Sequence, residues 1–209
     1  LLDSSIKFVL TRHEQGAAFM ADVYGRLTDK PGVCLATLGP GATNLITGVA
    51  DANMDFAPVV AIAGQGSTTR LHKESHQVLD LVRIFEPISK YSAQIRSPEV
   101  IPEIVRKAFK DATNEKPGAS FIEFPENVAG MSVENTAPLK RQFPTLPVPS
   151  REKIREAAAL INSAKFPIIM AGNGVIRAGA SHSLITFAET LNIPVATTFM
   201  AKGVIPNAH

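Results

Sequence analysis

The sequence lacks several features on which whole classes of protein depend. It has one cysteine, Cys34, so it cannot build a disulfide framework, and we expect a reducing, cytoplasmic compartment. No apolar run approaches the roughly 20 residues that a membrane-spanning helix needs. The net charge is only +2 and is dispersed, which does not favour binding to nucleic acid or to a membrane surface. Hydrophobic residues make up 45% of the chain, so a globular protein with a real core remains.

The length indicates more than one domain. The 209 residues exceed the roughly 100–150 residues of a typical domain. The chain begins without an initiator methionine, and it stops at His209 shortly after a strand-like run and a turn. We therefore expect it to be a piece of a longer polypeptide.

Short apolar runs alternate with helical patterns over the first 130 residues. The expected strands are residues 6–10, 33–38, 59–63, 89–95 and 119–124. The expected helices are residues 14–27, 42–53, 77–85 and one that Ser97-Pro98 opens and that continues to Ala112. Strands separated by helices predict an α/β fold with a parallel sheet, right-handed crossovers and helices on both faces.

The pattern breaks between residues 131 and 150, where four prolines crowd a stretch without periodicity. Beyond it, Ser150 can cap a helix at residues 151–163, followed by a strand at 166–171, a turn at 172–174, a helix at 181–191 and a strand at 194–198. The sequence thus predicts a first domain at 1–130, an extended linker at 131–150 and the start of a second, Rossmann-like α/β domain at 151–209.

Glu14 stands where the first expected strand gives way to a helix. Thr11 and Glu14 have the spacing of a capping box, in which each side chain bonds the backbone N–H of the other residue. The same position is the carboxyl end of a parallel strand, where open α/β sheets bind ligands. Local pattern alone favours the structural role.

Two further segments carry polar or flexible residues. Gly39-Pro40-Gly41-Ala42-Thr43-Asn44 follows the second strand, and its glycines would let a ligand approach the backbone, although the local pattern alone favours a plain turn and helix start. His72 and His76 lie four residues apart, but no third ligand is near, so we expect no metal site in this chain. No Ser-His-Asp or Cys-His arrangement stands out.

Taken together, the weak signals form a specific series. The blocks are Arg-His-Glu-Gln-Gly-Ala-Ala at 12–18, Lys-Pro-Gly-Val at 30–33, Gly-Pro-Gly-Ala-Thr-Asn at 39–44 and Ala-Gly-Gln at 63–65. In order and spacing they resemble the pyrimidine-binding domain of thiamine-diphosphate (ThDP) enzymes, most closely the catalytic chain of acetolactate synthase. Residues 151–209 resemble the first third of that family's central domain.

The resemblance implies roles for five residues. Glu14 would hydrogen-bond N1′ of the cofactor's aminopyrimidine, so that the 4′ nitrogen takes the proton from C2 of the thiazolium. Gln77 matches a glutamine near the reaction centre, and Gly39, Pro40 and Asn44 lie in the loop beside the cofactor. The implied reaction is the decarboxylation of pyruvate and carboligation to a second 2-keto acid, a transferase activity of branched-chain amino acid biosynthesis.

The resemblance also implies what other parts of the enzyme would supply. Mg²⁺ and the diphosphate are held by a third domain, which would follow His209. The family's active site is shared between subunits, which implies a homodimer or homotetramer, with a regulatory subunit possible. We therefore expect this stretch alone to be inactive and to bind ThDP weakly. Lys116 stands where FAD-requiring members have arginine, so FAD is not expected and the catabolic, FAD-independent type is favoured.

Other functions fit the same residues. The rivals within the family are a sulfoacetaldehyde acetyltransferase, a pyruvate oxidase and a 2-keto acid decarboxylase. The glyoxylate carboligase branch lacks the glutamate, so Glu14 argues against it. A different class of hypothesis is a non-catalytic module that retains the fold.

Overall fold

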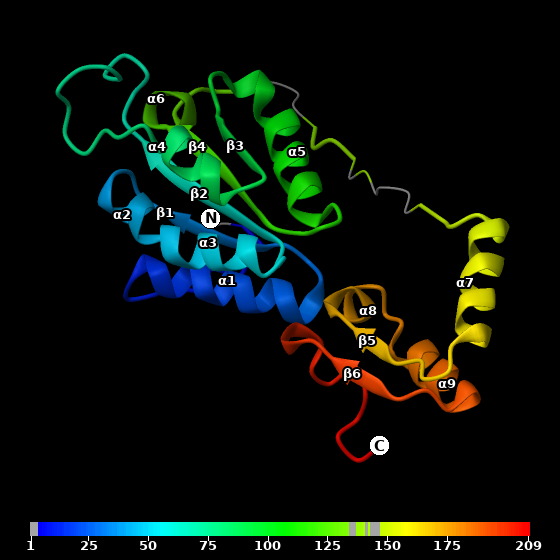
Figure 1. The fold of residues 1–209 in the computed structure, drawn as a ribbon. Helices are drawn as coiled ribbons and strands as arrows, with labels where there is room; N and C mark the ends of the chain where they lie inside the picture. The colour runs from blue at the N-terminus through cyan, green and yellow to red at the C-terminus, as the bar shows by residue number, and fades with distance from the viewer. Residues whose placement is uncertain (1–3, 134–136, 141, 143–146) are drawn as a thin grey trace. The chain divides into compact units, whose positions relative to one another are not determined.

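The computed structural model describes residues 4–133, 137–140, 142 and 147–209, and the chain forms two compact units that divide after Pro144. The first unit holds a four-stranded parallel sheet in the order β1-β2-β4-β3 (Figure 1). Its strands are β1 (Gly32–Ala36), β2 (Val59–Gln65), β3 (Tyr91–Gln94) and β4 (Ala119–Pro125). The predicted α/β fold with a parallel sheet is confirmed.

Helices cover both faces of this sheet, as predicted (Figure 1). One face packs against α1 (Glu14–Thr28), α3 (Ile46–Met54) and α4 (Leu81–Phe85), and the other packs against α5 (Ile101–Thr113). Two hydrophobic cores result, one on each face, because successive side chains of β2 point to opposite faces of the sheet. Val59 and Ala61 belong to the first core and Val60 to the second. A central strand buried on both faces reads as a continuous apolar run.

Close backbone approach fixes α1 against α3. A Cβ at Gly48 would lie 2.6 Å from the Cβ of Ala18, so only glycine permits this separation. Arg26 of α1 then bridges the two helices. Its guanidinium donates to Asp22 at 2.8 Å, to Asp51 at 2.7 Å and to Asp55 at 2.7 Å. One cation therefore pairs with three neighbouring carboxylates, of which Asp22 is buried.

The strand expected at residues 6–10 does not form. The side chains of Ile6, Phe8, Val9 and Leu10 are 52–84% exposed. The sheet order places β1 at an edge, and no strand among the described residues pairs with its open side. Without a neighbour to complete a ladder, the β-forming residues of this segment gain nothing from strand geometry.

Two expected helices differ from the prediction, one because it is divided and one because it begins later. The helix expected at 42–53 is two helices, α2 (Pro40–Asn44) and α3, separated at Leu45, whose N–H bonds the carbonyl of Ala42 in a tight turn. The helix expected from residue 77 begins only at Leu81, because Asp80 is its N-cap and accepts from the N–H of Arg83 at 3.2 Å.

Short elements complete the first unit. The 3₁₀ helix Glu86–Ile88 leads into β3, the 3₁₀ helix Pro98–Val100 opens α5, and α6 (Glu126–Ala129) follows β4. Where the predicted linker is described, residues 137–139 pack beside α5. Residues 134–136, 141 and 143–146 of that linker lie outside the described residues.

The second unit is a small α/β assembly. It contains α7 (Arg151–Ser163), β5 (Ile169–Ala171), α8 (Asn173–Arg177), α9 (Ser181–Leu191), β6 (Val195–Thr197) and the 3₁₀ helix Phe199–Ala201. β5 and β6 pair in parallel, and Ser150 caps α7 by accepting from the N–H of Lys153, as predicted. β5 is shorter than expected because its partner has three residues. The turn expected at 172–174 runs directly into α8.

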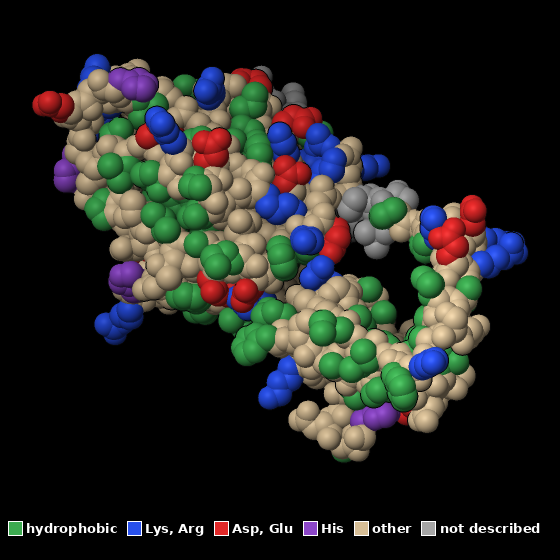
Figure 2. All heavy atoms as spheres, in the orientation of Figure 1, with side chains coloured by type: hydrophobic (Ala, Val, Ile, Leu, Met, Phe, Trp, Pro, Cys, Tyr) green, Lys and Arg blue, Asp and Glu red, His purple; other side chains and the backbone are tan. Residues whose placement is uncertain are grey.

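The surface carries no concentration of one charge on the face shown in Figure 2, where Lys and Arg side chains intersperse with Asp and Glu. Across the described ranges, every helix is too short or too polar to pass through a bilayer.

Candidate active site

The carboxyl ends of β1, β2 and β4 meet at one edge of the sheet and border a cavity of about 530 Å³. This volume is in the range of small-molecule sites. Most of the lining is apolar, with a few polar groups at the rim. The lining residues are Phe8, Leu35, Ala36, Thr37, Leu38, Ile62, Gly64, Gln65, Phe124, Glu126 and Ala129. Open parallel sheets bind ligands at this edge.

Glu14 is the first residue of α1. The N-cap is His13, whose Nδ1 accepts from the N–H of Gln15 at 3.2 Å. The capping box expected between Thr11 and Glu14 is therefore wrong, because that motif requires the glutamate at the third helical position. Because His13 caps the helix, the Glu14 carboxylate is not needed for capping and can bond another residue.

The partner of Glu14 is Asn44, at the end of α2. Asn44 Nδ2 donates to Glu14 Oε2 at 3.0 Å. This hydrogen bond is the largest cause of a lowered pKa at Glu14, followed by a backbone hydrogen bond at its own residue. The carboxylate is therefore ionised at neutral pH, and among the described residues no Lys, Arg or His forms a salt bridge with it.

The glycines of the 39–44 loop connect Glu14 to the cavity. A Cβ at Gly41 would lie 3.5 Å from Glu14 Oε1 and 2.6 Å from Cγ2 of Thr37, which lines the cavity. A side chain at position 41 would therefore crowd both the cavity wall and the second carboxylate oxygen of Glu14. Glu14 itself is half-exposed and is not among the lining residues.

Gln77 meets the same loop from the opposite side. Its backbone has φ of 58°, and a Cβ at Gly39 would lie 2.7 Å from the Cβ and from the carbonyl oxygen of Gln77. Gly39 has φ of 55° and ψ of −119°, a region that favours glycine. Pro40 begins α2, where its missing N–H costs nothing. The structure therefore brings Glu14 to Asn44 and Gln77 to Gly39, at the two ends of one short loop.

A buried polar cluster at the ends of β2 and β4 was not predicted. Gln65 Nε2 donates to Glu123 Oε2 at 3.1 Å and to the carbonyl of Leu79 at 2.7 Å, and Gln94 Nε2 donates to Glu123 Oε1. Glu123 is 2% exposed, and burial is the first cause of its raised pKa. The signal in the sequence was a carboxylate near the end of the mostly apolar strand at 119–124.

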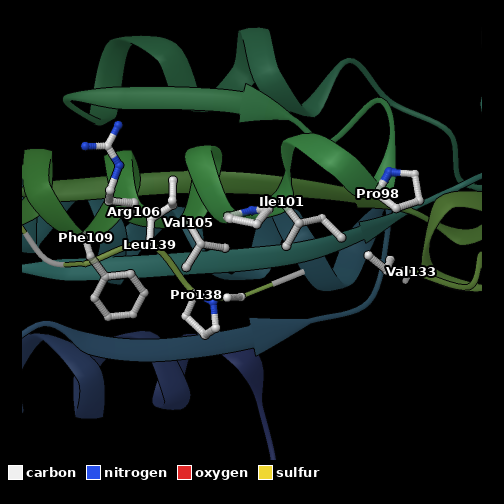
Figure 3. A pocket seen from close by; sticks show the side chains of 10 residues that line it. Pro98, Ile101, Val105, Arg106, Phe109, Val133, Pro138 and Leu139 are labelled. Carbon is white, nitrogen blue, oxygen red and sulfur yellow. The ribbon is translucent and has the colours of Figure 1, made fainter. Parts of the chain in front are cut away.

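A second cavity, of about 440 Å³, lies against the outer side of α5 (Figure 3). Ile101, Val105 and Phe109 of α5 and Pro138 and Leu139 of the following segment line it. Among the described lining residues Arg106 is the one titratable group, so the described wall offers mainly packing surface.

Neither histidine nor cysteine supplies a metal site within the described ranges, where no group of three His, Cys, Asp or Glu residues is placed to hold an ion. His72 lies in a turn, with φ of 64°, so it does not share a helical face with His76. Cys34 is buried in β1, and burial raises its thiol pKa to about 12.

Comparisons with known families agree with this geometry. Residues 1–84 match the N-terminal TPP-binding domain of thiamine pyrophosphate enzymes, and residues 154–209 match the central domain of the same enzymes. The chain belongs to the thiamine pyrophosphate enzyme family. The two matches fall in the two structural units, on either side of Pro144.

Several proteins similar to this chain are named acetolactate synthase large subunits. The chain is 42% identical to the probable acetolactate synthase large subunit of Methanocaldococcus jannaschii, covering all of this chain and 36% of that protein. It is 39% identical to the acetolactate synthase large subunit of Corynebacterium glutamicum, over 99% of this chain and 33% of the relative. It is 39% identical to the isozyme 1 large subunit of Escherichia coli, over 99% of this chain and 36% of the relative. The chain spans about a third of the length of these relatives.

Proposed function

We propose that the whole protein is an acetolactate synthase, which decarboxylates pyruvate and joins the product to a second 2-keto acid with thiamine diphosphate as cofactor. The observation that carries the proposal is the ionised Glu14 carboxylate, held by Asn44 beside a glycine loop at the carboxyl ends of the strands. The names of the relatives support the choice of substrate class.

The residues present fit the pyrimidine half of this cofactor. An aminopyrimidine needs a hydrogen-bonding partner at a ring nitrogen and a surface that lets the flat ring approach the backbone. Glu14 supplies an acceptor, and one of its two oxygens stays without the Asn44 bond. Glycine at positions 39 and 41 leaves the space that side chains would fill.

When bound, thiamine diphosphate supplies the carbanion chemistry that no side chain of the chain can supply. The part of Glu14 is to hold a proton shared with N1′, which requires an ionised carboxylate at rest, and the Asn44 hydrogen bond favours that form. We assign Gln77 to a place beside the reacting carbon. The close contact with Gly39 sets the position of Gln77. Because Glu14 is half-exposed, the facing subunit and the cofactor itself must exclude water from it.

The remaining parts of the proposal follow the family pattern. We assign residues 1–130 to the pyrimidine-binding domain, 131–150 to a linker and 151–209 to the first part of the central domain. Mg²⁺ and the diphosphate would be held outside this stretch, by a second subunit in a homodimer or homotetramer in the cytoplasm. The names of the relatives as large subunits favour a regulatory partner. Lys116 favours activity without FAD.

Acetolactate formation by the whole protein tests the proposal. Purified protein is incubated with pyruvate, ThDP and Mg²⁺, with and without FAD, and acetolactate is measured after acid conversion to acetoin. We expect ThDP-dependent activity that Glu14→Gln reduces by a factor on the order of 10²–10⁴, the usual contribution of a positioned acid–base group. Acetate or acetaldehyde as the main product would point to an oxidase or decarboxylase. Full activity in Glu14→Gln would overturn the role of the carboxylate.

A further inference from the structure

The segment between β2 and α4 carries Gln77, yet it has no regular secondary structure of its own. Residues 66–80, the 66–80 loop, form a series of turns with local backbone hydrogen bonds. A long irregular loop holds a side chain in one place only if its ends and its middle are fixed by contacts with the scaffold. The fixing contacts therefore decide where Gln77 lies.

The beginning of the loop is tied to α6. Asn127 Oδ1 accepts from the N–H of Thr68 at 2.9 Å, and Asn127 Nδ2 donates to Thr68 Oγ1 at 2.9 Å. Arg70 pairs with Glu126 on the same helix. Gly66 also lies against Val78, since a Cβ there would be 2.9 Å from Val78 Cγ2. The two ends of the loop thus meet at its base.

The end of the loop is tied to the buried cluster. Gln65 Nε2 makes two hydrogen bonds, one to the carbonyl of Leu79 at 2.7 Å and one to Glu123 Oε2 at 3.1 Å. The side-chain oxygen Oε1 of Gln65 accepts from the backbone N–H of Gly66 at 2.9 Å. Rotation of the side-chain amide would therefore break all three hydrogen bonds. Gln94 holds the other oxygen of Glu123. Leu79 lies two residues from Gln77.

We propose that Gln65, oriented by Glu123, is a positioning residue that fixes Leu79 and thereby holds Gln77 against Gly39 beside the reaction centre. The inference rests on the proposed function for its kinetic consequence, but the loop contact itself is independent of it. Glu123 explains why the amide of Gln65 points its nitrogen, and not its oxygen, at Leu79. The Leu79 carbonyl and the N–H of Gly66 favour the same orientation, so Glu123 is one of three partners that fix the amide.

An exchange of the two side chains separates positioning from folding. In Gln65→Glu combined with Glu123→Gln, the new amide at 123 donates to the new carboxylate at 65 and still accepts from Gln94. The carboxylate at 65 also still accepts from the N–H of Gly66. The bond to the Leu79 carbonyl is lost, because a carboxylate has no hydrogen to donate, and an acceptor oxygen then faces the carbonyl oxygen. Ser92→Ala is the control, since it removes another half-buried bond to a carbonyl, 2.8 Å to Val82, and leaves all three bonds of Gln65 in place.

The experiment measures hydrogen–deuterium exchange of peptides from the 66–80 loop, together with kcat and KM for pyruvate, in the whole protein. We expect the double variant to raise loop exchange by about five- to ten-fold, as for the loss of one hydrogen bond. We expect kcat to fall on the order of ten- to a hundred-fold, as for a misplaced catalytic group, with KM changed far less. Ser92→Ala should leave loop exchange and kcat as in the wild type.

Unchanged loop exchange in the double variant, or an equal increase in Ser92→Ala, would overturn the inference. If the double variant does not fold, Gln65→Met tests the same bond, because it removes the donor and keeps the shape. The two proposals fail differently. A wild type without acetolactate formation contradicts the proposed function, whereas an active wild type whose loop ignores the substitutions contradicts only the positioning role.

Discussion

Gly39 is the position at which a single methyl group should do most damage to the site. Gly39→Ala places a Cβ 2.7 Å from two atoms of Gln77, in a backbone conformation with φ of 55° and ψ of −119°. The conformational strain costs about 1–3 kcal/mol. The overpacking adds about 1–3 kcal/mol because backbone atoms must move. We expect the first unit to lose about 2–6 kcal/mol of unfolding free energy, the sum of these two effects.

Gly16→Ala is the matched control. A Cβ at Gly16 would meet nothing within 4 Å, and the residue lies in the first turn of α1. The same added methyl should therefore stabilise the helix by about 0.5–1 kcal/mol. The two variants differ in sign although the chemical change is identical.

Tyrosine fluorescence during urea unfolding measures this effect. The chain has no tryptophan, and its two tyrosines, Tyr24 and Tyr91, both lie in the first unit. The signal therefore follows the first unit alone, which avoids fitting one transition to a chain of two units. If Gly39→Ala proved as stable as Gly16→Ala, the contact between Gly39 and Gln77 would be refuted.

Three further predictions concern buried groups of the first unit. Arg26→Met should lower the unfolding free energy of this unit by about 2–3 kcal/mol, because it leaves three carboxylates together without their cation. The control Arg70→Met removes an exposed ion pair and should cost less than about 1 kcal/mol. Equal losses in urea unfolding would contradict this prediction. The raised pKa of Glu123 means that its contribution to stability is fully present below the unfolded pKa and is lost as pH rises through the folded pKa. The stability advantage of wild type over Glu123→Gln should therefore shrink as the pH rises above about 4, the ordinary pKa of a glutamate. An advantage that grows with pH would contradict this prediction. The Cys34 thiol, with a pKa of about 12, should resist a thiol reagent in the native protein and react with one equivalent in denaturant; rapid native reaction would show that β1 is not buried as described.

The sequence predicted those elements that periodicity and capping residues define. The helix at Glu14–Thr28, the helix at Arg151–Ser163 with its Ser150 cap and the parallel order of strands all follow from local pattern. The prediction was wrong where contacts with other segments, and not local composition, decide the secondary structure. Residues 6–10 have strand composition but no neighbour to pair with, and the residues after Gln77 have helical composition but meet the Asp80 cap.

The candidate site shows the same division. Glu14, Gly39, Asn44 and Gln77 could be named because a known series of motifs contains them. Their pairing could not, because Asn44 reaches Glu14 across 30 residues and Gln77 reaches Gly39 across the sheet edge. Glu123 was missed because its hydrogen-bond partners, Gln65 and Gln94, are distant in sequence and only the fold brings them to it.

The most direct test of the central claim is the exchange of the C2 proton of bound thiamine diphosphate with D₂O, followed by NMR after rapid acid quench of the whole protein. Because Glu14 is proposed to share the proton at N1′, Glu14→Gln should slow this exchange on the order of 10²–10⁴-fold while the cofactor stays bound. Asn44→Ala, which removes the hydrogen bond that favours the ionised carboxylate, should slow it to a lesser degree. An exchange rate in Glu14→Gln equal to that of the wild type, with cofactor occupancy verified, would contradict the account.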